Sequence, residues 1–275
     1  MRSIWLIAKS VLIEAVRRKE IYVIVLVVVS AILVTGTVRF FGYEGMSKFY
    51  REVSLKIMNL ATMVTVVVLS ARQLPREFDT RTIYPLLAKP VGRVSFLLGK
   101  FLGVMLAGWF CYALFVILFL VGMKYLGADL DLGLFAQTVY LQMLALSVVA
   151  SLSFMLSLLF NADAAITVAV LVFALGGTLS GAISLVYEHV STFGLFSIPW
   201  LDGSWYQVSI GQLFMQALNY GIPQLTLFDL SGKLVHENSW DLIGLNTMAG
   251  LSVYASVFLF VYLGIAYLLF AKRPL

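Results

Sequence analysis

Cysteine and histidine are scarce in this sequence, with one Cys and two His among 275 residues. A single cysteine, Cys111, excludes a disulfide framework and a cysteine-based metal cluster within the chain. His189 and His236 have no acidic cluster beside them, a pattern more typical of solvated surface histidines than of metal ligands. The sequence therefore predicts no metal site.

Charged residues are also scarce, at 12% of the chain, whereas soluble domains average about 25%. The hydrophobic share is 61% and the mean hydropathy is +0.97. A water-soluble globule cannot bury that much apolar surface, so we expect an integral membrane protein. The sequence also has no concentrated, soluble basic domain, which argues against a nucleic-acid partner.

The apolar residues are gathered in runs, and a helix needs about 20 such residues to cross about 30 Å of hydrocarbon. The runs are continuous instead of alternating, which favours helices over barrel strands. We therefore predict an all-α integral membrane protein, a single transmembrane domain over 1–275, with six transmembrane helices at 21–38, 55–74, 101–123, 132–160, 164–187 and 248–271.

The last four predicted spans contain no Asp, Glu, Lys or Arg. Ionisable residues inside a membrane are tolerated mainly where function needs them. Their absence from these spans argues against a proton or ion relay, and against a membrane-embedded enzyme.

The distribution of Lys and Arg predicts the orientation. With the N-terminus in the cytoplasm, thirteen of the 19 basic residues lie on the cytoplasmic side and six on the outer side. This bias agrees with the positive-inside rule, and six spans then place both termini in the cytoplasm. Residues 75–100 become a cytoplasmic connection, and residues 188–247 an extracytoplasmic segment.

Two segments outside the spans have patterns of their own. Residues 2–19 place their apolar side chains near one helical face, which favours an amphipathic helix lying in the inner membrane interface over a simple basic anchor. Residues 188–247 contain three tryptophans, whose amphipathic rings often anchor a protein at the membrane surface. We expect this segment to form a small folded cap on the outer interface.

Charge is dense in one stretch of the first half, SARQLPREFDTRTIYPLLAKPVGRVSFLLGK, residues 70–100, with six basic and two acidic residues. Pro75 is expected to end the helix of the second span, with a new helix starting near Arg76. The stretch also contains the apolar residues Phe78, Ile83, Leu86 and Leu87. They pack either on the inner end of the bundle or in a pocket of a partner, and the residues alone leave both readings open.

The end of this stretch superficially suggests a phosphate-binding loop. Such a loop has four residues between its glycines and Ser or Thr after its lysine, because that hydroxyl binds Mg²⁺. Here six residues separate Gly92 from Gly99, and Phe101 follows Lys100. If the protein uses ATP, another chain must bind it.

The order Arg76-Glu77-Phe78-Asp79-Thr80-Arg81-Thr82-Ile83-Tyr84-Pro85-Leu86-Leu87-Ala88-Lys89-Pro90-Val91-Gly92-Arg93, followed by Gly99-Lys100, resembles a stretch typical of the ABC-2 type permease family. A second stretch, Ile222-Pro223-Gln224-Leu225-Thr226-Leu227-Phe228-Asp229-Leu230, resembles the one that many members carry before their last span. The resemblance covers essentially the whole chain. Pro85 departs from it, because members more often have a helix former there.

The resemblance implies that 75–100 is a coupling segment, which sits in a groove of a separate ATPase subunit. Glu77 would then make a polar contact, Phe78, Ile83 and Leu86 would be buried anchors, and Arg81 and Arg93 would be charge partners at the rim. The family works as two permeases with two ATPases, so the expected partners are two ATPase copies and a second permease copy or paralogue. ATP and Mg²⁺ would be bound by the ATPase, with no cofactor on this chain.

The resemblance also implies a translocation path between the second and fifth spans across the dimer axis. The candidate path residues are Asn59, Thr62, Thr65, Phe173, Gly177 and Ser184. The alternative is that they serve helix packing alone, as small residues often do in membranes.

Together these observations predict the membrane-spanning subunit of an ATP-driven exporter in a bacterial or archaeal cytoplasmic membrane, and no enzyme activity in this chain. One alternative is an ABC-type complex that does mechanical work on an extracytoplasmic partner docked at 188–247. Another is a membrane assembly scaffold with no ATPase. The sequence does not identify the cargo.

Overall fold

The computed structural model describes residues 2–17, 25, 29–30, 32, 43–79, 92–127, 130–174, 223–235 and 242–272. The chain divides into two compact units, one of Met1–Ala169 with Phe228–Leu275 and one of Val170–Leu227. Every element in these ranges is a helix, which confirms the all-α fold class. Most of the predicted span 21–38, and residues 175–222 of the predicted fifth span and cap, lie outside the described residues.

The larger unit is built from α1 (Arg2–Arg17), α3 (Tyr43–Asp79), α5 (Arg93–Tyr125), α6 (Leu132–Leu159), α9 (Ser231–Val235) and α10 (Leu245–Lys272). Four helices of the described chain are long and apolar enough to cross a membrane: Ser47–Pro75, Arg93–Tyr125, Leu132–Leu159 and Leu245–Lys272. They contain or match the predicted spans 55–74, 101–123, 132–160 and 248–271.

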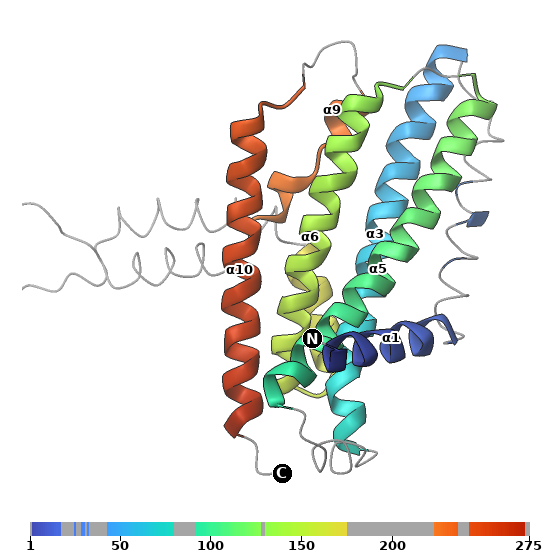
Figure 1. The fold of residues 1–275 in the computed structure, drawn as a ribbon. Helices are drawn as coiled ribbons and strands as arrows, with labels where there is room; N and C mark the ends of the chain where they lie inside the picture. Colours follow the sequence, from blue (N-terminus) through green and yellow to red (C-terminus); the bar gives the residue numbers. More distant parts are fainter. Residues whose placement is uncertain are drawn as a thin grey trace, which may run out of the picture. The chain divides into compact units, whose positions relative to one another are not determined.

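The four long helices run side by side, and α1 crosses α5 near one end (Figure 1). We call this end, which contains the last turns of α3 and α10 and the first turns of α5, the α1 end. The opposite end, with the first turns of α3, α6 and α10, is the α9 end. There the side-chain amide of Gln137 exchanges two hydrogen bonds of 3.0 Å with the backbone of Ile243, and so fastens α6 to the start of α10.

The helix α6 forms the centre of this unit. Within its most apolar stretch of 18 residues, 83% of α6 is buried, whereas 28% of the corresponding stretch of α10 is buried. Five buried hydroxyl groups of α6 donate to backbone carbonyls of their own helix, which satisfies them without a partner from another helix. Small residues of this kind let helix backbones approach closely, and here they are Thr138, Ser147, Ser151, Ser153 and Ser157.

The helix α3 is longer than the predicted span and does not stop at Pro75. It begins at Tyr43 and continues through Pro75 to Asp79, so the prediction that Pro75 ends this helix was wrong. A proline removes one backbone hydrogen bond, and only four residues of α3 follow it. Leu74 is fully buried, which holds the backbone beside Pro75 in the packed helix.

The chain before α10 enters the bundle. Phe228 and Leu230 are buried, and the Phe228 ring lies 6.2 Å from that of Tyr254, centroid to centroid. Tyr254 lies nine residues after the first residue of α10, about 14 Å along the helix axis. On a span of this length that depth falls within the hydrocarbon layer of about 30 Å. This part of the predicted cap therefore packs between helices.

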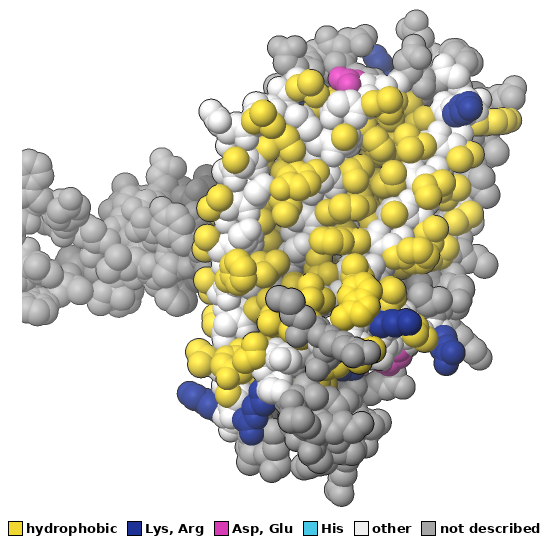
Figure 2. Space-filling model, viewed as in Figure 1, with side chains coloured by type: hydrophobic (Ala, Val, Ile, Leu, Met, Phe, Trp, Pro, Cys, Tyr) yellow, Lys and Arg dark blue, Asp and Glu magenta, His cyan; other side chains and the backbone are white. Residues whose placement is uncertain are grey.

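The surface of the larger unit agrees with a membrane location. Figure 2 shows hydrophobic side chains across the broad middle of one face and Lys and Arg toward its ends. The large exposed hydrophobic side chains on α10 are Leu245, Val253, Val257, Phe260, Val261, Ile265 and Leu268. A face of this composition is suited to lipid or to another membrane helix.

The smaller unit is described at its two ends. Residues 170–174 complete the helix Ala162–Ala174, and residues 223–227 contain most of the short 3-10 helix η1, Leu225–Phe228.

Candidate coupling site at the α1 end

The 75–100 segment is helical at both of its ends. Residues 76–79 form the last turn of α3, and residues 93–100 form the first turns of α5. The connection is therefore shorter than the loop predicted from the sequence. Glu77 and Phe78 lie on the last turn of α3, whereas Arg81, Ile83 and Leu86 lie outside the described residues.

Arg93 contacts the end of α10. Its guanidinium donates a hydrogen bond of 2.7 Å to the carbonyl oxygen of Ala271. That carbonyl belongs to the last turn of a helix, where backbone acceptors lack helical partners and cations are favoured by the helix dipole. Arg93, predicted at the rim of a partner's groove, thus fastens the first turn of α5 to the last turn of α10.

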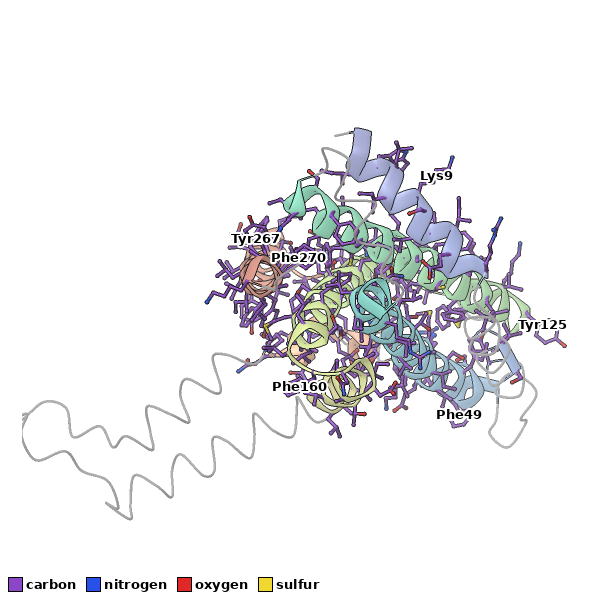
Figure 3. The ribbon with its side chains drawn as sticks, turned by 90° about the horizontal axis from the view of Figure 1, so that it is seen from below. Lys9, Phe49, Tyr125, Phe160, Tyr267 and Phe270 are labelled. Atoms are coloured by element: carbon purple, nitrogen blue, oxygen red, sulfur yellow. The ribbon has the colours of Figure 1, made fainter. Side chains whose placement is uncertain are left out.

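An aromatic contact supports the same junction. The rings of Phe96 and Phe270 are stacked, with centroids 5.9 Å apart and an interplanar angle of 20°. Both side chains are fully buried. Figure 3 shows Phe270 on the α10 helix, viewed from the α1 end. The start of α5 and the end of α10 are therefore joined by a polar contact and a ring contact.

Lys100 is buried in this junction, with 5% of its surface exposed. Its ammonium group lies 3.4 Å from the side-chain oxygen of Gln73 on α3 and 5.9 Å from the centre of the Phe96 ring. Gln73 is 2% exposed. A lysine beside a span would be expected to extend its ammonium to the membrane surface, whereas here it points between helices.

The helix α1 lies against α5 immediately beside Lys100. A Cβ atom at Gly103 would lie 2.5 Å from Cβ of Val11 and 2.8 Å from the carbonyl oxygen of Ala8. At Gly99 it would lie 2.9 Å from Cβ of Ile7. The two glycines thus form the close-approach surface for α1, as small residues four apart do between membrane helices.

The amphipathic helix predicted at 2–19 is confirmed as a helix, but its buried face is narrow. Ala8, Val11 and Ala15 are buried, while Trp5 and Leu6 are about 60% exposed. Lys9 points away from the bundle in Figure 3. The apolar residues of α1 are therefore divided between contact with α5 and an exposed face suited to the membrane interface.

An ion pair lies further out at this end. The Arg72 guanidinium on α3 is 3.9 Å from the carboxylate of Asp163 on the helix Ala162–Ala174. The side chain of Asp163 is 93% exposed and that of Arg72 is 38% exposed. Solvent screens such a pair, which makes it a weak contact beside the buried ones.

The predicted path residues have different environments. Thr62 and Thr65 are buried, and their hydroxyls donate to the carbonyls of Met58 and Ala61 in their own helix. Asn59 is half-buried, and its side-chain oxygen is buried without a hydrogen-bond partner. Phe173 is half-buried in the helix Ala162–Ala174. Gly177 and Ser184 lie outside the described residues.

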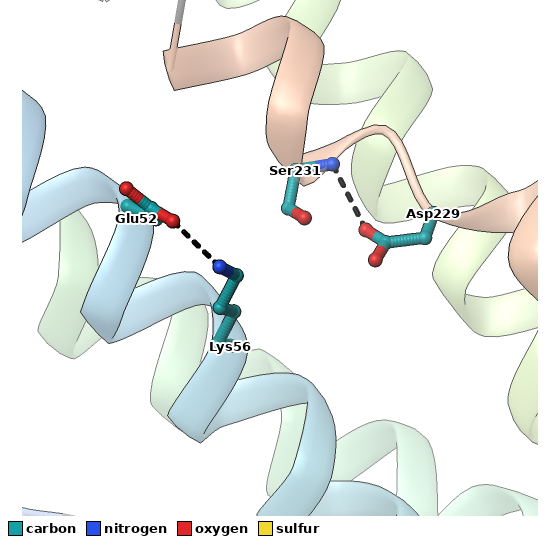
Figure 4. A network of polar contacts seen from close by, with 4 residues as sticks. All are labelled: Glu52, Lys56, Asp229 and Ser231. Carbon is teal, nitrogen blue, oxygen red and sulfur yellow. Dashed lines mark hydrogen bonds and ion pairs between the residues drawn. The ribbon is translucent and has the colours of Figure 1, made fainter. Parts of the chain in front are cut away.

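Further charged groups lie toward the α9 end. Glu52 and Lys56 form an ion pair of 2.6 Å along α3, and the carboxylate of Asp229 accepts a hydrogen bond of 2.9 Å from the backbone of Ser231 (Figure 4). The second contact is an Asx turn that starts α9. These contacts are local, within one helix and within one turn.

The sequence interpretation missed Gln73, Lys100 and the pair Gly99–Gly103. The spacing of the two glycines, with the small residues Ala8 and Ala15 in the N-terminal helix, was a usable signal for the contact between α1 and α5. Nothing local to Lys100 indicates burial, because its partner is 27 residues away. Within the described ranges no three metal-binding side chains gather.

Comparison with known families gives a match over nearly the whole chain. A sequence model of the ABC-2 family of transporter proteins matches residues 5–275. No curated protein matches the chain.

Proposed function

This chain belongs to the ABC-2 transporter family, and we propose that it is the membrane-spanning permease subunit of an ATP-driven exporter. The observation that carries the proposal is the family match over residues 5–275, on a chain with four described helices able to cross a membrane. A permease of this kind is a transport component and not itself an enzyme.

ATP and Mg²⁺ would be bound by two copies of a separate ATPase, with this chain paired to a second copy or a paralogue. The 75–100 segment would dock on the ATPase through Glu77, Phe78, Arg81, Ile83 and Leu86, with Arg93 at its edge. In support, the segment joins α3 directly to α5, two long helices whose α1 ends are packed together. Helices joined in this way would carry movement of the docked segment into the membrane.

In this proposal the α1 end faces the cytoplasm, and the protein resides in a bacterial or archaeal cytoplasmic membrane with both termini inside. The excess of Lys and Arg on that side supports the orientation. The exposed apolar face of α1 would lie in the inner membrane interface, where Trp and Leu are favoured.

Among the predicted path residues, Asn59 is the one whose structure best supports a place on the cargo path. Its buried oxygen lacks a partner, and a buried polar group of this kind is costly unless something binds it. We expect Asn59→Leu to change cargo-stimulated ATP hydrolysis while the ATPase stays bound. An unchanged stimulation would make Asn59 a packing residue.

The proposed function is tested by purifying the tagged chain from its native membrane in mild detergent and identifying what accompanies it by mass spectrometry. We expect a stoichiometric ATPase, and we expect Phe78→Asp to lose it. Tyr125→Asp is the matched control, because it introduces the same charge at an 82% exposed aromatic residue of the opposite end. Recovery of no ATPase with the unsubstituted chain would favour the scaffold alternative.

A further inference from the structure

Four helices meet around one buried cation at the α1 end. Lys100 belongs to α5, and its ammonium group lies 3.4 Å from the Gln73 oxygen of α3. The same ammonium is 5.9 Å from the ring of Phe96, which stacks on Phe270 of α10. The neighbouring Gly99 and Gly103 hold α1. One side chain therefore lies at the junction of α1, α3, α5 and α10.

The position of this junction relates it to the 75–100 segment. Gln73 lies shortly before the segment on α3, and Lys100 is its last residue on α5. The contact thus closes a loop of chain whose middle, in the proposed function, docks on the ATPase. Without a contact between α3 and α5 at this point, the two ends of the segment could move independently, each with its own helix.

We propose that Lys100 is a positioning residue, which holds Gln73 so that α3 and α5 move as one rigid lever when the 75–100 segment moves. The role as a lever rests on the proposed function, whereas the contact itself does not. A hydrogen bond to a charged donor is stronger than one between neutral groups, and the low dielectric of the interior strengthens it further.

Two features make a positioning role more fitting than a purely stabilising one. Burying a lysine is costly, and an apolar side chain of similar length would fill the same space at less cost. In addition, the side-chain nitrogen of Gln73 is buried without a hydrogen-bond partner, so the pair is not optimised for stability alone. Buried polar contacts of this kind can fix the register of two helices.

The contact between α3 and α5 continues beyond this pair. A Cβ atom at Gly108 would overlap Val66, and one at Gly122 would overlap the hydroxyl of Tyr50. Beside Gly122 the Tyr50 hydroxyl also donates a long hydrogen bond of 3.5 Å to the carbonyl oxygen of Phe119, so α3 and α5 have a polar contact toward the α9 end. Lys100 supplies a polar contact between these two helices at the α1 end.

The test uses spin labels on Leu60→Cys of α3 and Val94→Cys of α5, with Cys111→Ala as background. Leu60 and Val94 are about half exposed, and Cys111 is buried. In the purified complex of permease and ATPase we expect one narrow label-to-label distance distribution, unchanged when ATP and vanadate trap the ATPases. The decisive variant is the pair Lys100→Met with Gln73→Leu.

This double variant replaces both polar groups by apolar ones of similar shape, which is often nearly neutral for stability and so preserves folding. We expect the distance distribution to broaden, and to shift when ATP and vanadate are added, while ATP hydrolysis continues. Gln73→Glu, which places a carboxylate where Lys100 now meets the Gln73 amide, should keep the narrow distribution. A narrow, unshifted distribution in the double variant would overturn the proposal.

The same labels on the chain without its ATPase separate this inference from the proposed function. Broadening in the double variant there shows that the contact fixes α3 against α5, whatever the partner. If no ATPase accompanies the unsubstituted chain, the proposed function fails and the contact is judged by this second measurement. Label-to-label distance distributions of equal width in the unsubstituted chain and the double variant would show that Lys100 does not hold α3 against α5.

Discussion

The two ends of the larger unit are held together by different kinds of contact. At the α1 end, two buried or half-buried cations, Lys100 and Arg93, join separate helices. At the α9 end the contacts between helices are aromatic stacks, of Tyr50 on Phe119 and of Phe119 on Phe135, together with uncharged hydrogen bonds such as those of Gln137 with the backbone of Ile243. Toward that end, the ion pair between Glu52 and Lys56 lies along α3.

This difference suggests separate tasks for the two ends. Directional polar contacts fix the helices that flank the 75–100 segment. In our proposal the ATPase moves this segment during ATP hydrolysis. Stacked rings hold by shape and dispersion, and they tolerate small shifts better than a hydrogen bond does. Substitutions at the α1 end should therefore disturb coupling, and those at the α9 end chiefly stability.

The largest effect on ATP hydrolysis is expected from Gly103→Leu. The added side chain has no room beside Val11 and Ala8, so α1 must leave its place on α5. Overpacking of this kind typically costs about 1–3 kcal/mol. We expect a lower midpoint of thermal unfolding in detergent, together with reduced ATP hydrolysis of the complex.

The matched control is Gly264→Leu, since a Cβ atom at Gly264 of α10 would have no neighbour within 4 Å. It should leave both measurements unchanged. Equal losses in the two variants would mean that the contact of α1 with α5 is unimportant.

Tyr50→Ala at the α9 end is expected to have a smaller effect on ATP hydrolysis than Gly103→Leu, and its main effect is on stability. It removes a fully buried ring that stacks on Phe119, and loss of a large buried side chain costs about 3–5 kcal/mol in soluble cores. The loss should be smaller in a membrane, because lipid replaces apolar contacts. We expect a lower unfolding midpoint with ATP hydrolysis per folded complex retained.

Tyr125→Ala serves as the control, because Tyr125 lies at the same end and is 82% exposed. A Tyr50→Ala protein that stays folded but no longer couples ATP hydrolysis to transport would contradict the division between the two ends.

The smallest effect is expected from Asp163→Asn, which removes the exposed ion pair with Arg72. Exposed pairs contribute about 0–1 kcal/mol. We expect no measurable change in the unfolding midpoint at moderate salt. A clear drop that disappears at high salt would show that the α1 end also depends on exposed charges.

Much of the fold could be predicted from apolar runs, because crossing hydrocarbon requires them. Their ends were harder to predict: α3 extends to Tyr43 and Asp79 through residues that are polar or follow a proline. The depth of Phe228 could not be predicted, since it depends on a ring in α10. Lys100 was missed for the same reason, because burial of a cation is decided by a distant partner.

The 75–100 segment was recognisable from its charge and its motif, and Glu77 and Phe78 are on the helical turn that leads into it. Arg93 was assigned to a partner from that motif, whereas the structure gives it an internal acceptor on α10. This acceptor could not be predicted from the residues around Arg93, because it is a backbone carbonyl 178 residues away. Thr62 and Thr65 were predicted as path residues from the family resemblance; both hydroxyls bond within α3, and their place on a path stays a prediction.

The most direct test of the central claim is the amount of ATPase that accompanies the tagged chain from its native membrane, compared between the unsubstituted chain and Phe78→Asp. Our account predicts a stoichiometric ATPase with the first and its loss from the second, with Tyr125→Asp behaving as the unsubstituted chain. An ATPase that binds Phe78→Asp equally well, or no ATPase in any sample, would contradict it.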